Sequence, residues 1–497
     1  MKFAISTSLI LHYSIASALA STLCQPWTNN TLPRIFILTD IANEPDDTQS
    51  LVRALTHADL YNITGLVAIT SFWLPNATYP DQIHTLVDGY ATVRENLQSH
   101  SNGTFPTASY LHSVIKTGAI TYGKQALHAL AAGEPLSPGA QDLIAAIDAS
   151  PEPLYVQLWG GANTLASAFW YVNSTRSISD LDAFTSKIRA YAISDQDDTG
   201  IWIRQNFPQV RYIVSRPGFN QYPNAAWIGI SSTSVDLGGP NNAFISKDWI
   251  KQNIQVGPLG ALYPDVLYIM EGDSPALLYT MQNGLGDPEH PNWGSWGGRY
   301  TSNPIDGDTQ YGDAVDVVVG QNGQTYNTNK ATIWRWREAF QSEFAARMQW
   351  TLAPNGPDGN TTHPPVVVVN GSCDTKALEF DVHVGDNIVL DATQTYSSDP
   401  NPQLNLTWFQ YREPSSYQSS PNVVPSINIT SPTNSQGRIA RFTIPEPTDG
   451  TCVLPEDCPV LHVVLAVKDQ QAKNPITRYK RVVLRVQAWK KSEKAEL

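Results

Sequence analysis

Four carboxylates lie within a short stretch near the N-terminus, directly after a strand-like segment. Residues 34–39 are rich in β-forming side chains, and the acidic residues that follow are Asp40, Glu44, Asp46 and Asp47. Carboxylates this close repel one another unless a cation or shared protons relieve the repulsion. Ca²⁺ takes about six to eight oxygen ligands, so the pattern predicts a calcium site that includes Asp40, Asp46 and Asp47. As an alternative, Asp46 and Asp47 would simply stabilise the first turn of the following helix through its dipole.

Two further polar segments also follow strand-like runs. Gly160 and Gly161 let the backbone approach a ligand, and Asn163 after them can cap a helix or offer a carbonyl to a metal. In the second segment, Glu271 and Asp273 flank a glycine ahead of a proline that begins a helix. Asp273 is therefore either a helix N-cap or the last protein carboxylate of the metal site.

Residues 286–300 form a glycine- and aromatic-rich segment that does not follow a core pattern. Exposed Trp and Tyr rings suit stacking on sugars or bases, and Glu289 or His290 could protonate a leaving group. A rigid loop folded on itself is the alternative. The predicted substrate-binding residues, in this segment and in other loops, are Asn43, Trp73, Asn163, Glu289, Trp293, Trp296, Arg299 and Tyr300.

A regular framework must position these segments, and residues 33–352 alternate strand-like and helix-like patterns. Strands are expected at residues 34–39, 64–70, 154–158, 187–193, 210–214 and 266–270. Helices are expected at residues 48–58, 139–149, 163–171 and 199–205, with a last amphipathic helix at residues 330–350. The alternation predicts an α/β domain, a mostly parallel sheet with helices on both faces. In such sheets ligands bind at the carboxyl ends of the strands.

The residue pattern changes after a linker at residues 353–365, which is rich in Pro, Gly and Asn. Short strand-like runs separated by turn signals then occupy residues 366–490. Their spacing predicts an all-β, immunoglobulin-like sandwich domain. Within it, residues 384–408 look like a module of the polycystic-kidney-disease or cadherin kind.

The N-terminus and the cysteines indicate export. Residues 1–20 have one positive charge, a short apolar run and an Ala-Leu-Ala site, as a secretory signal peptide does. Four cysteines in a secreted chain favour two disulfides, and three pairings are open. Cys452–Cys458 is the local bridge, and Cys24–Cys373 would accompany it. Asn-x-Ser/Thr acceptors, which suggest glycosylation, occur at Asn29, Asn62, Asn76, Asn102, Asn173, Asn360, Asn370, Asn405 and Asn428.

The net charge of the chain limits the classes of molecule that it is expected to bind. A net charge of −13 disfavours nucleic acids and anionic membrane surfaces, which bind basic patches. No apolar run after the signal segment reaches membrane-spanning length. The mature protein is therefore expected to be soluble and extracellular, without nucleic-acid or membrane partners, and its oligomeric state is left open.

Two motifs make the chain similar to a known family. They are Thr-Asp-Ile-Ala-Asn-Glu-Pro-Asp-Asp at residues 39–47 and Asn-Gly-Leu-Gly-Asp-Pro-Glu-His-Pro-Asn-Trp-Gly-Ser-Trp-Gly-Gly-Arg at residues 283–299. Both resemble the secreted branch of the inosine-uridine nucleoside hydrolase superfamily, often labelled cellulose-binding proteins. That branch joins a nucleoside-hydrolase-like domain to a C-terminal β-sandwich. The resemblance spans about residues 33–490 and implies the same two-domain arrangement.

The resemblance also implies a ligand set. The superfamily signature, Asp-x-Asp-Pro-Gly-x-Asp-Asp, binds Ca²⁺ and positions a water molecule against a ribosyl anomeric carbon. Its first, third and fourth aspartates fall on Asp40, Asp46 and Asp47. The metal-binding carbonyl of a later turn falls on Asn163, and the final metal aspartate falls on Asp273.

The chain departs from the superfamily pattern at two positions. The second aspartate of the signature falls on Ala42, and the histidine that can assist the leaving base falls on Gly272. Asp46, or Glu44 as the nearest spare carboxylate, is then the expected base. The candidate acids are Glu271, Glu289 and His290.

These observations lead to one functional hypothesis and two alternatives. The chain is expected to be a secreted glycosidase-type hydrolase that attacks an anomeric carbon of extracellular, plant-wall carbohydrate with metal-assisted water. The first alternative is a carbohydrate-binding protein, with cellulose as the ligand, that has lost catalysis. The second is a secreted nucleoside hydrolase that releases free base.

Overall fold

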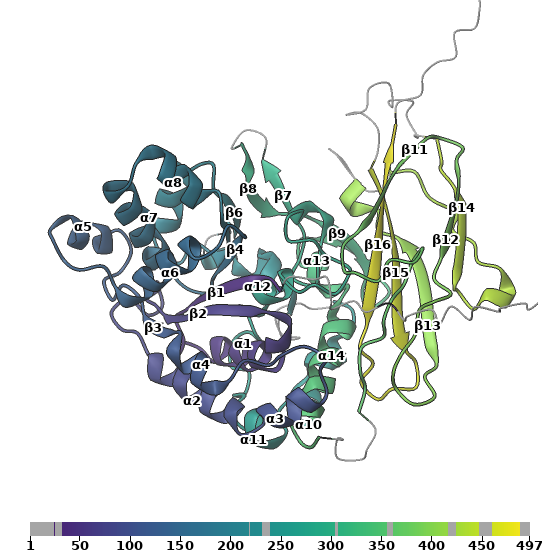
Figure 1. Ribbon diagram of the computed structural model, residues 1–497, viewed down its shortest axis with the longest axis horizontal. Coiled ribbons are helices and arrows are strands. Elements are labelled where there is room, and N and C mark those ends of the chain that lie inside the picture. Colours follow the sequence, from purple (N-terminus) through teal and green to yellow (C-terminus); the bar gives the residue numbers. More distant parts are fainter. Residues whose placement is uncertain are drawn as a thin grey trace, which may run out of the picture.

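The computed structural model describes residues 24, 32–217, 219–230, 239–303, 307–354, 361–415, 424–446 and 460–487. Within these ranges the chain forms an α/β domain and, beside it, a C-terminal β region (Figure 1). An eight-stranded sheet is the centre of the α/β domain in the described residues. From edge to edge its strands are β3 (Ile115–Thr117), β2 (Asn62–Ala68), β1 (Arg34–Thr39), β4 (Leu154–Leu158), β5 (Ile188–Ser194), β6 (Arg211–Ser215), β8 (Gly307–Asp313) and β7 (Tyr300–Asn303).

The central strand β1 shows how the sequence builds both faces of this sheet. Its side chains alternate, so Ile35 and Ile37 enter one core and Phe36 and Leu38 enter the other. Because helices cover both faces, the strand is apolar on both sides. In the described part of the sheet, neighbouring strands are parallel except β7, which is antiparallel to β8.

The helices divide between these two faces. On the Ile35 face lie α1 (Pro45–Thr56), α2 (Pro80–Ala91), α3 (Arg94–Ser99), α4 (Ala108–Ser113), α10 (Lys247–Asn253), α11 (Gly257–Gly260), α12 (Ser274–Tyr279), α13 (Ala331–Trp334) and α14 (Arg337–Trp350). On the Phe36 face lie α5 (Gln125–Ala131), α6 (Pro138–Asp148), α7 (Asn163–Thr175), α8 (Ile178–Thr185) and α9 (Thr199–Asn206). Short 3₁₀ helices are η2 (Ala58–Leu60), η3 (Phe219–Asn224), η4 (Ala226–Ile230), η5 (Asn242–Ile245), η6 (Pro291–Trp293), η7 (Glu413–Ser415) and η9 (Thr433–Ser435).

The predicted α/β domain with a mostly parallel sheet is confirmed, but one predicted strand is wrong. Residues 266–270 form a bent segment that pairs with no strand among the described residues, and Leu267 and Tyr268 are 68 % and 66 % exposed. An apolar run becomes a strand where a neighbour satisfies its backbone hydrogen bonds. The helix predicted at residues 330–350 is also interrupted, because Trp336 lies in a turn between α13 and α14.

Two sheets face each other in the C-terminal β region. In the described residues, one sheet has the order β11 (Leu378–Val382), β16 (Arg478–Val486), β15 (Val460–Asp469) and β13 (Leu404–Gln410), and the other pairs β12 (Asn387–Asp391) with β14 (Ile439–Thr443). Leu390, Leu406 and Val463 belong to the single core between them. The region is thus a sandwich, as predicted. A separate hairpin of β9 (Asp316–Val319) and β10 (Thr325–Thr328) belongs to the α/β domain.

The sheet that contains β16 packs against the α/β domain beside α14 (Figure 1). Glu343 of α14 forms an ion pair of 2.6 Å with Arg478 of β16 and one of 3.0 Å with Arg347 of its own helix. Arg347 also pairs with Asp59 at 2.7 Å. All four side chains are buried, so this network joins the two parts of the chain without access to water.

Acid is expected to weaken this junction. Burial alone would raise the pKa of Glu343, but Arg478 and Arg347 outweigh it and lower the pKa from its usual 4.5 to about 2. The Glu343 carboxylate therefore stabilises the fold fully above its unfolded pKa of 4.5, and that stability is lost as the pH falls toward 2. The loss is on the order of 3 kcal/mol. Urea unfolding of Glu343→Gln should lose less stability over this pH range than the wild type, whereas equal losses would contradict the assignment.

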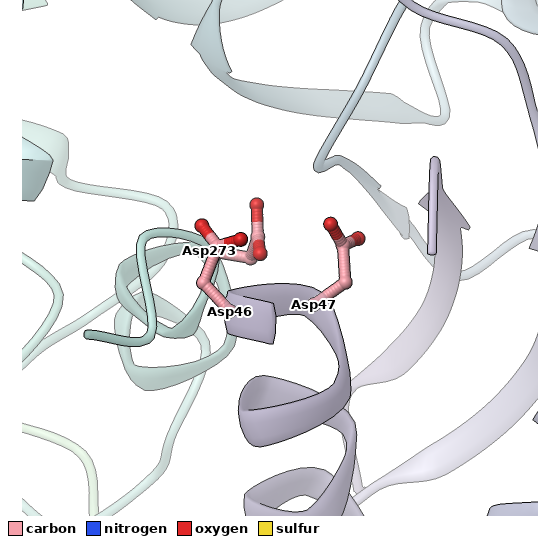
Figure 2. A group of neighbouring side chains, drawn as sticks. All are labelled: Asp46, Asp47 and Asp273. Atoms are coloured by element: carbon pink, nitrogen blue, oxygen red, sulfur yellow. The ribbon is translucent and has the colours of Figure 1, made fainter. Parts of the chain in front are cut away.

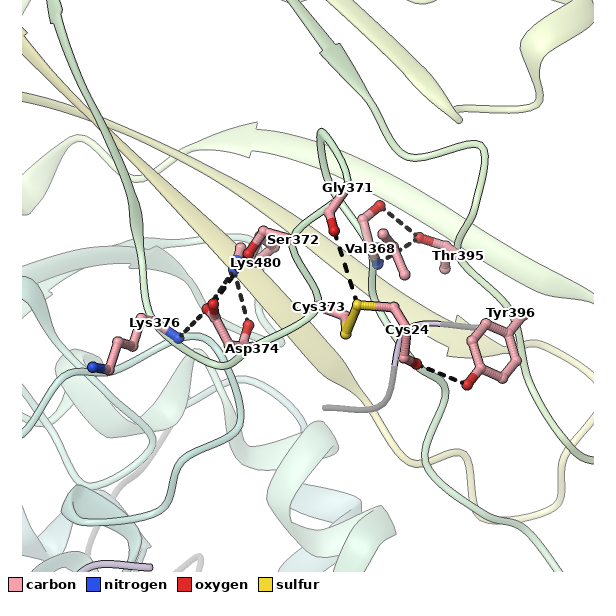
Figure 3. Close-up of a disulfide and its surroundings, with 10 residues drawn as sticks. All are labelled: Cys24, Val368, Gly371, Ser372, Cys373, Asp374, Lys376, Thr395, Tyr396 and Lys480. Atoms are coloured by element: carbon pink, nitrogen blue, oxygen red, sulfur yellow. Dashed lines mark hydrogen bonds and ion pairs between the residues drawn. A yellow bond between two sulfur atoms is a disulfide. The ribbon is translucent and has the colours of Figure 1, made fainter. Parts of the chain in front are cut away.

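A disulfide ties the N-terminal end of the described chain to the C-terminal β region (Figure 3). The Cα atoms of Cys24 and Cys373 are 6.0 Å apart, and Tyr396 donates a hydrogen bond to the Cys24 carbonyl at 3.1 Å. This bond belongs to the pairing in which Cys452 and Cys458 would form the local bridge. Those two cysteines and the predicted signal peptide lie outside the described residues. No helix in the described ranges is long and apolar enough to span a membrane.

Candidate metal centre

The candidate site lies at the carboxyl ends of the neighbouring strands β2, β1, β4 and β5. β1 lies between β2 and β4, so the chain leaves β1 toward one side and later returns on the other. Ligand-binding crevices form at such switch points. Asp40 directly follows β1, Gly160 follows β4, and Ser71 and Gln196 come shortly after β2 and β5.

Three aspartates converge at this edge (Figure 2). Asp46 and Asp47 occupy the first turn of α1, and Asp273 directly precedes α12. One carboxylate oxygen from each side chain lies within 4.8 Å of the other two. The three residues are 6 %, 3 % and 1 % exposed, so their charges are largely removed from water. Buried charges are costly unless a partner of opposite charge compensates them.

The surroundings of these aspartates supply negative charge. Burial, with the charges of Glu44 and Asp40, raises the pKa of Asp46 to about 7. Burial and the neighbouring carboxylates raise the pKa of Asp47 and that of Asp273 well above the usual range. Burial also raises the pKa of Asp40 to about 6. Among the described residues no Lys, Arg or His forms an ion pair with Asp40, Asp46, Asp47 or Asp273.

Two hydroxyl groups orient the acidic side chains. The Thr39 hydroxyl, at the end of β1, donates a hydrogen bond to Asp47, and the Ser71 hydroxyl donates one to Asp40. Both hydroxyls are buried with the carboxylates that they bind. Hydrogen bonds to an ionised carboxylate favour its charged form, so these contacts orient Asp40 and Asp47 and partly offset the effect of burial on their pKa.

Two glycines leave room for the carboxylates. A Cβ atom at Gly272 would lie 2.7 Å from Oδ2 of Asp46, and one at Gly160 would lie 2.7 Å from Oδ1 of Asp40. Close-packed interiors do not absorb such contacts without movement. A histidine at position 272, which the superfamily pattern has, would displace Asp46. The packing around Gly272 therefore leaves no room for that histidine.

The residues present fit a hard divalent cation. Oδ2 of Asp273 is buried and has no hydrogen-bond partner in the described part of the chain. Leaving such an acceptor unsatisfied costs about 1–3 kcal/mol, and more for a charged group. Asp46, Asp47 and Asp273, with Asp40 beside them, offer the carboxylate oxygens that Ca²⁺ prefers, and water or ligand hydroxyls can complete its shell.

Asn163, the fifth predicted ligand, is fully buried, and its side-chain Oδ1 has no hydrogen-bond partner among the described residues. Its side-chain nitrogen donates to the Thr70 hydroxyl at 2.8 Å and to the Thr121 carbonyl at 2.7 Å. Its backbone carbonyl accepts a hydrogen bond from the Ser167 hydroxyl at 2.7 Å. The structure therefore places Asn163 as the first residue of α7, where it joins neighbouring loops.

Glu271 does not act as a free acid in this structure, which corrects the sequence prediction. Its two oxygens accept hydrogen bonds from Arg53, from Tyr263 at 2.8 Å and from Ser274 at 2.6 Å. Arg53 and Glu271 are both fully buried. The carboxylate is the counterion of a buried arginine on α1, so its role is structural.

Glu289 lies at the opposite edge of the sheet, which corrects a second prediction. Its carboxylate accepts a hydrogen bond from Tyr155 at 2.9 Å and ion pairs from Arg189 at 3.0 Å and Arg211 at 2.9 Å. These three partners stand at the beginnings of β4, β5 and β6. Because the strands are parallel, their beginnings lie at the edge away from Asp40. Glu289 therefore does not reach the group of aspartates.

The aromatic segment joins the two parts of the chain, and the predicted sugar-stacking rings Trp293 and Trp296 lie inside that junction. His290, a predicted acid, is exposed and forms an ion pair of 2.9 Å with Asp287. His290 stacks on Trp293 with ring centres 4.0 Å apart, and Trp293 contacts His462 of β15. Trp296 is fully buried and donates from Nε1 to the Tyr479 hydroxyl of β16 at 3.2 Å. Trp293 and Trp296 pack against the sandwich and are 6 % and 0 % exposed, so they offer no free face to a sugar.

Arg299 and Tyr300, at the end of the same segment, bind residues of the α/β domain. Arg299 forms an ion pair of 2.7 Å with Asp316, and Tyr300 is hydrogen-bonded to Tyr191 inside the domain. Both residues are almost completely buried. The alternative of a rigid, packed loop describes the segment better than a substrate-binding surface does.

The other predicted residues lie in the loops next to the aspartates. The Asn43 amide donates to the Asp40 carbonyl at 3.2 Å, and burial raises the pKa of the half-buried Glu44. Phe72 and Trp73 are 46 % and 43 % exposed and pack edge to face with centroids 5.0 Å apart. The Trp73 amide donates to the same serine hydroxyl that holds Asp40. Exposed aromatic rings beside polar side chains can stack on a sugar.

Sequence reasoning missed three side chains around the site. Thr39 and Ser71 are polar residues at or just after the ends of buried strands, and that position is the signal that could have identified them. Tyr222 bonds to the Ser194 hydroxyl at 3.1 Å and to the Trp73 side chain. It lies far from the acidic loop in the sequence, where no local pattern indicates such a contact.

Comparisons with known proteins agree with this fold. Residues 34–300 match the family model "Cellulose-binding Sde182, nucleoside hydrolase-like domain", and residues 387–486 match "Cellulose-binding protein Sde0182, C-terminal domain". The chain is similar to the solved structure of a nucleoside hydrolase-related hypothetical protein from Saccharophagus degradans that is associated with carbohydrate metabolism. The two are 31 % identical with a TM-score of 0.72, over 92 % of this chain and 100 % of the other. No curated protein matched the chain.

Proposed function

The chain belongs to the family of cellulose-binding Sde182 proteins with a nucleoside hydrolase-like domain, and from this premise we propose that it is a secreted, Ca²⁺-dependent hydrolase of carbohydrate glycosyl bonds. The crevice at the carboxyl ends of β1 and β4 would be its active site. The convergence of Asp46, Asp47 and Asp273 carries the proposal. Buried carboxylates without a cationic side chain require a bound cation or shared protons, and Ca²⁺ also holds sugar hydroxyls and water.

The residues around the crevice have separate roles in this proposal. A bound Ca²⁺ would supply the positive charge that holds a water molecule and sugar hydroxyls beside the aspartates. Asp46 would take the proton from the attacking water as the anomeric carbon becomes oxocarbenium-like. Glu44, half-buried at the rim, would protonate the leaving group or replace Asp46 as base. Thr39 and Ser71 keep neighbouring carboxylates oriented.

A substrate panel tests the proposal. The purified chain would be incubated with polysaccharides, oligosaccharides, aryl glycosides and nucleosides, with Ca²⁺ or with a chelator. We expect new reducing ends from at least one carbohydrate, and their loss in the chelator. Release of free base from inosine or uridine would identify a nucleoside hydrolase instead. Binding without turnover of any substrate in the panel would show that the chain is not a hydrolase of these substrates.

A second candidate function is carbohydrate binding without catalysis. Ala42 stands where the superfamily has a second aspartate, and its φ of +82° is unusual for a residue other than glycine. The three acid candidates are engaged as well. Glu271 pairs with Arg53, Glu289 lies at the far edge of the sheet, and His290 pairs with Asp287. Chelator-sensitive retention on insoluble cellulose, with no products in the panel, would support this candidate.

Extracellular location is part of the proposal. The disulfide between Cys24 and Cys373 supports it, because disulfides persist in oxidising compartments. A secreted location also gives the crevice access to polysaccharide, which does not enter cells intact. Detection of the processed chain in culture medium, with an N-terminus after the predicted signal peptide, would test the location.

Trp73→Ala is expected to weaken saccharide binding about three- to tenfold, because one stacking ring at the rim is lost. Tyr171→Ala is the matched control, since Tyr171 is exposed to a similar degree (41 %) on α7, away from the rim. Affinity for a soluble oligosaccharide, measured by calorimetry in Ca²⁺ buffer, is the readout. Equal losses in both variants, or none in Trp73→Ala, would contradict a stacking role.

A further inference from the structure

A groove of about 190 Å³ lies between the α/β domain and the C-terminal sheet. Ala339 and Ser342 of α14 form one wall, and Asn405, Thr407 and Phe409 of β13 form the other. The groove is separate from the group of aspartates, because it lies at the boundary between the two folded parts and none of those aspartates lines it. It combines hydroxyl and amide groups with an aromatic ring, a mixture that suits one sugar ring.

The β13 wall contains a complete glycosylation acceptor. Side chains alternate along a strand, so Asn405 and Thr407 face the groove while Leu406 enters the sandwich core. Asn405-Leu406-Thr407 has the Asn-x-Thr pattern of an N-glycosylation site. Both residues that the transfer requires therefore face the same cavity.

The Asn405 side chain is also available for transfer. It makes no hydrogen bond in the described part of the chain, although it is half-buried. The other described acceptor asparagines lie on the open surface: Asn62, Asn76, Asn102, Asn173, Asn370 and Asn428. Asn405 thus differs from them, because a sugar attached to it would meet the walls of a cavity.

We propose that Asn405 carries an N-linked glycan whose first sugar fills this groove and joins the α/β domain to the C-terminal β region. During secretion, a base of the host's saccharide transferase takes one proton from Asn405 Nδ2, and this nitrogen bonds to the anomeric carbon of a saccharide pyrophosphate donor. The pyrophosphate leaves with the electrons of the broken C–O bond. The attached sugar contacts the Phe409 ring and lies beside the ion pair of 2.6 Å between Glu338 and Lys468, which also spans the groove.

The inference uses the secreted location proposed above but not the metal site, so failure of one is distinguishable from failure of the other. The full chain would be secreted from a eukaryotic host and its glycopeptides mapped by mass spectrometry. We expect sugar at Asn405. We also expect an amidase acting on the native protein to release it at least tenfold more slowly than the sugar at the exposed Asn102.

Thr407→Val removes the acceptor while keeping Asn405, and valine suits a strand. We expect it to lower the melting temperature of the secreted protein by about 2–4 °C. In protein from a bacterial periplasm, which adds no such glycan, the same change should have no effect. Thr104→Val is the matched control, because it removes the acceptor at Asn102 on the open surface.

Two outcomes would overturn the inference. Secreted protein without sugar at Asn405 would show that the groove is not a modification site. Sugar at Asn405 that is released as fast as that at Asn102, with an unchanged melting temperature for Thr407→Val, would show that the glycan points away from the groove.

Discussion

Asp273→Asn is expected to abolish the Ca²⁺-dependent thermal stabilisation of the protein. Asp273 is 1 % exposed and its Oδ2 has no hydrogen-bond partner in the described part of the chain. An ion that binds the folded state alone stabilises it by about 2.7 kcal/mol at a hundred times its Kd. The asparagine keeps the shape of the side chain but replaces one of the three converging carboxylates with a neutral amide. Thermal unfolding with Ca²⁺ and with chelator measures the difference.

The same variant should be at least as stable as the wild type in chelator. Burial and the charges of Asp47 and Asp46 raise the pKa of Asp273 well above its usual range, which means that its charged form is unfavourable without a cation. Removing that charge relieves the repulsion. A merely structural aspartate would behave oppositely, because its replacement would lower stability in both buffers.

Asp195→Asn provides a control at the same edge of the sheet. Asp195 pairs with Arg204 at 2.7 Å, so it already has its own cation and lies outside the aspartate group. This variant should keep the full Ca²⁺ response. An unchanged response in Asp273→Asn, or no response in the wild type, would exclude a calcium site formed by the aspartates.

The part of the site that the sequence predicted best is the part that is local in the chain. β1, the acidic loop and α1 are consecutive, so Asp40, Asp46 and Asp47 could be placed at one strand end from their spacing alone. Asp273 comes from a distant segment, and its position was predicted through a family resemblance. Its neighbour Glu271 could not be interpreted, because the partner that neutralises it, Arg53, lies 218 residues away.

The aromatic segment at residues 286–300 shows the opposite case. Its composition resembles an exposed sugar-binding loop, yet Trp296 donates to Tyr479, which lies 183 residues later in the chain. A sequence pattern records which rings are present and not which surface covers them. The family motif in this segment therefore belongs to the contact between the two parts of the chain. The acidic motif at residues 39–47 belongs to the candidate metal site.

Asp316→Ala is expected to cause the largest loss of stability at that junction, about 3–5 kcal/mol. Asp316 is fully buried and accepts from Arg299 at 2.7 Å, from Arg335 at 2.6 Å and from the Tyr411 hydroxyl at 2.7 Å. Burial alone would raise the pKa of Asp316, but Arg299 and Arg335 outweigh it and lower the pKa below its usual value. Removing the carboxylate leaves two guanidinium groups without this shared partner.

Glu338→Ala is the control, because it removes a different ion pair between the α/β domain and the C-terminal β region. Glu338 also reaches the C-terminal region, through Lys468, but their side chains are 41 % and 35 % exposed. Solvent screens such a pair, so its loss should cost about 0–1 kcal/mol. Urea unfolding gives both free energies, and calorimetry should show separate transitions for the two parts of Asp316→Ala. A loss no larger than that of Glu338→Ala, with a single transition, would show that the aromatic contacts hold the junction without Asp316.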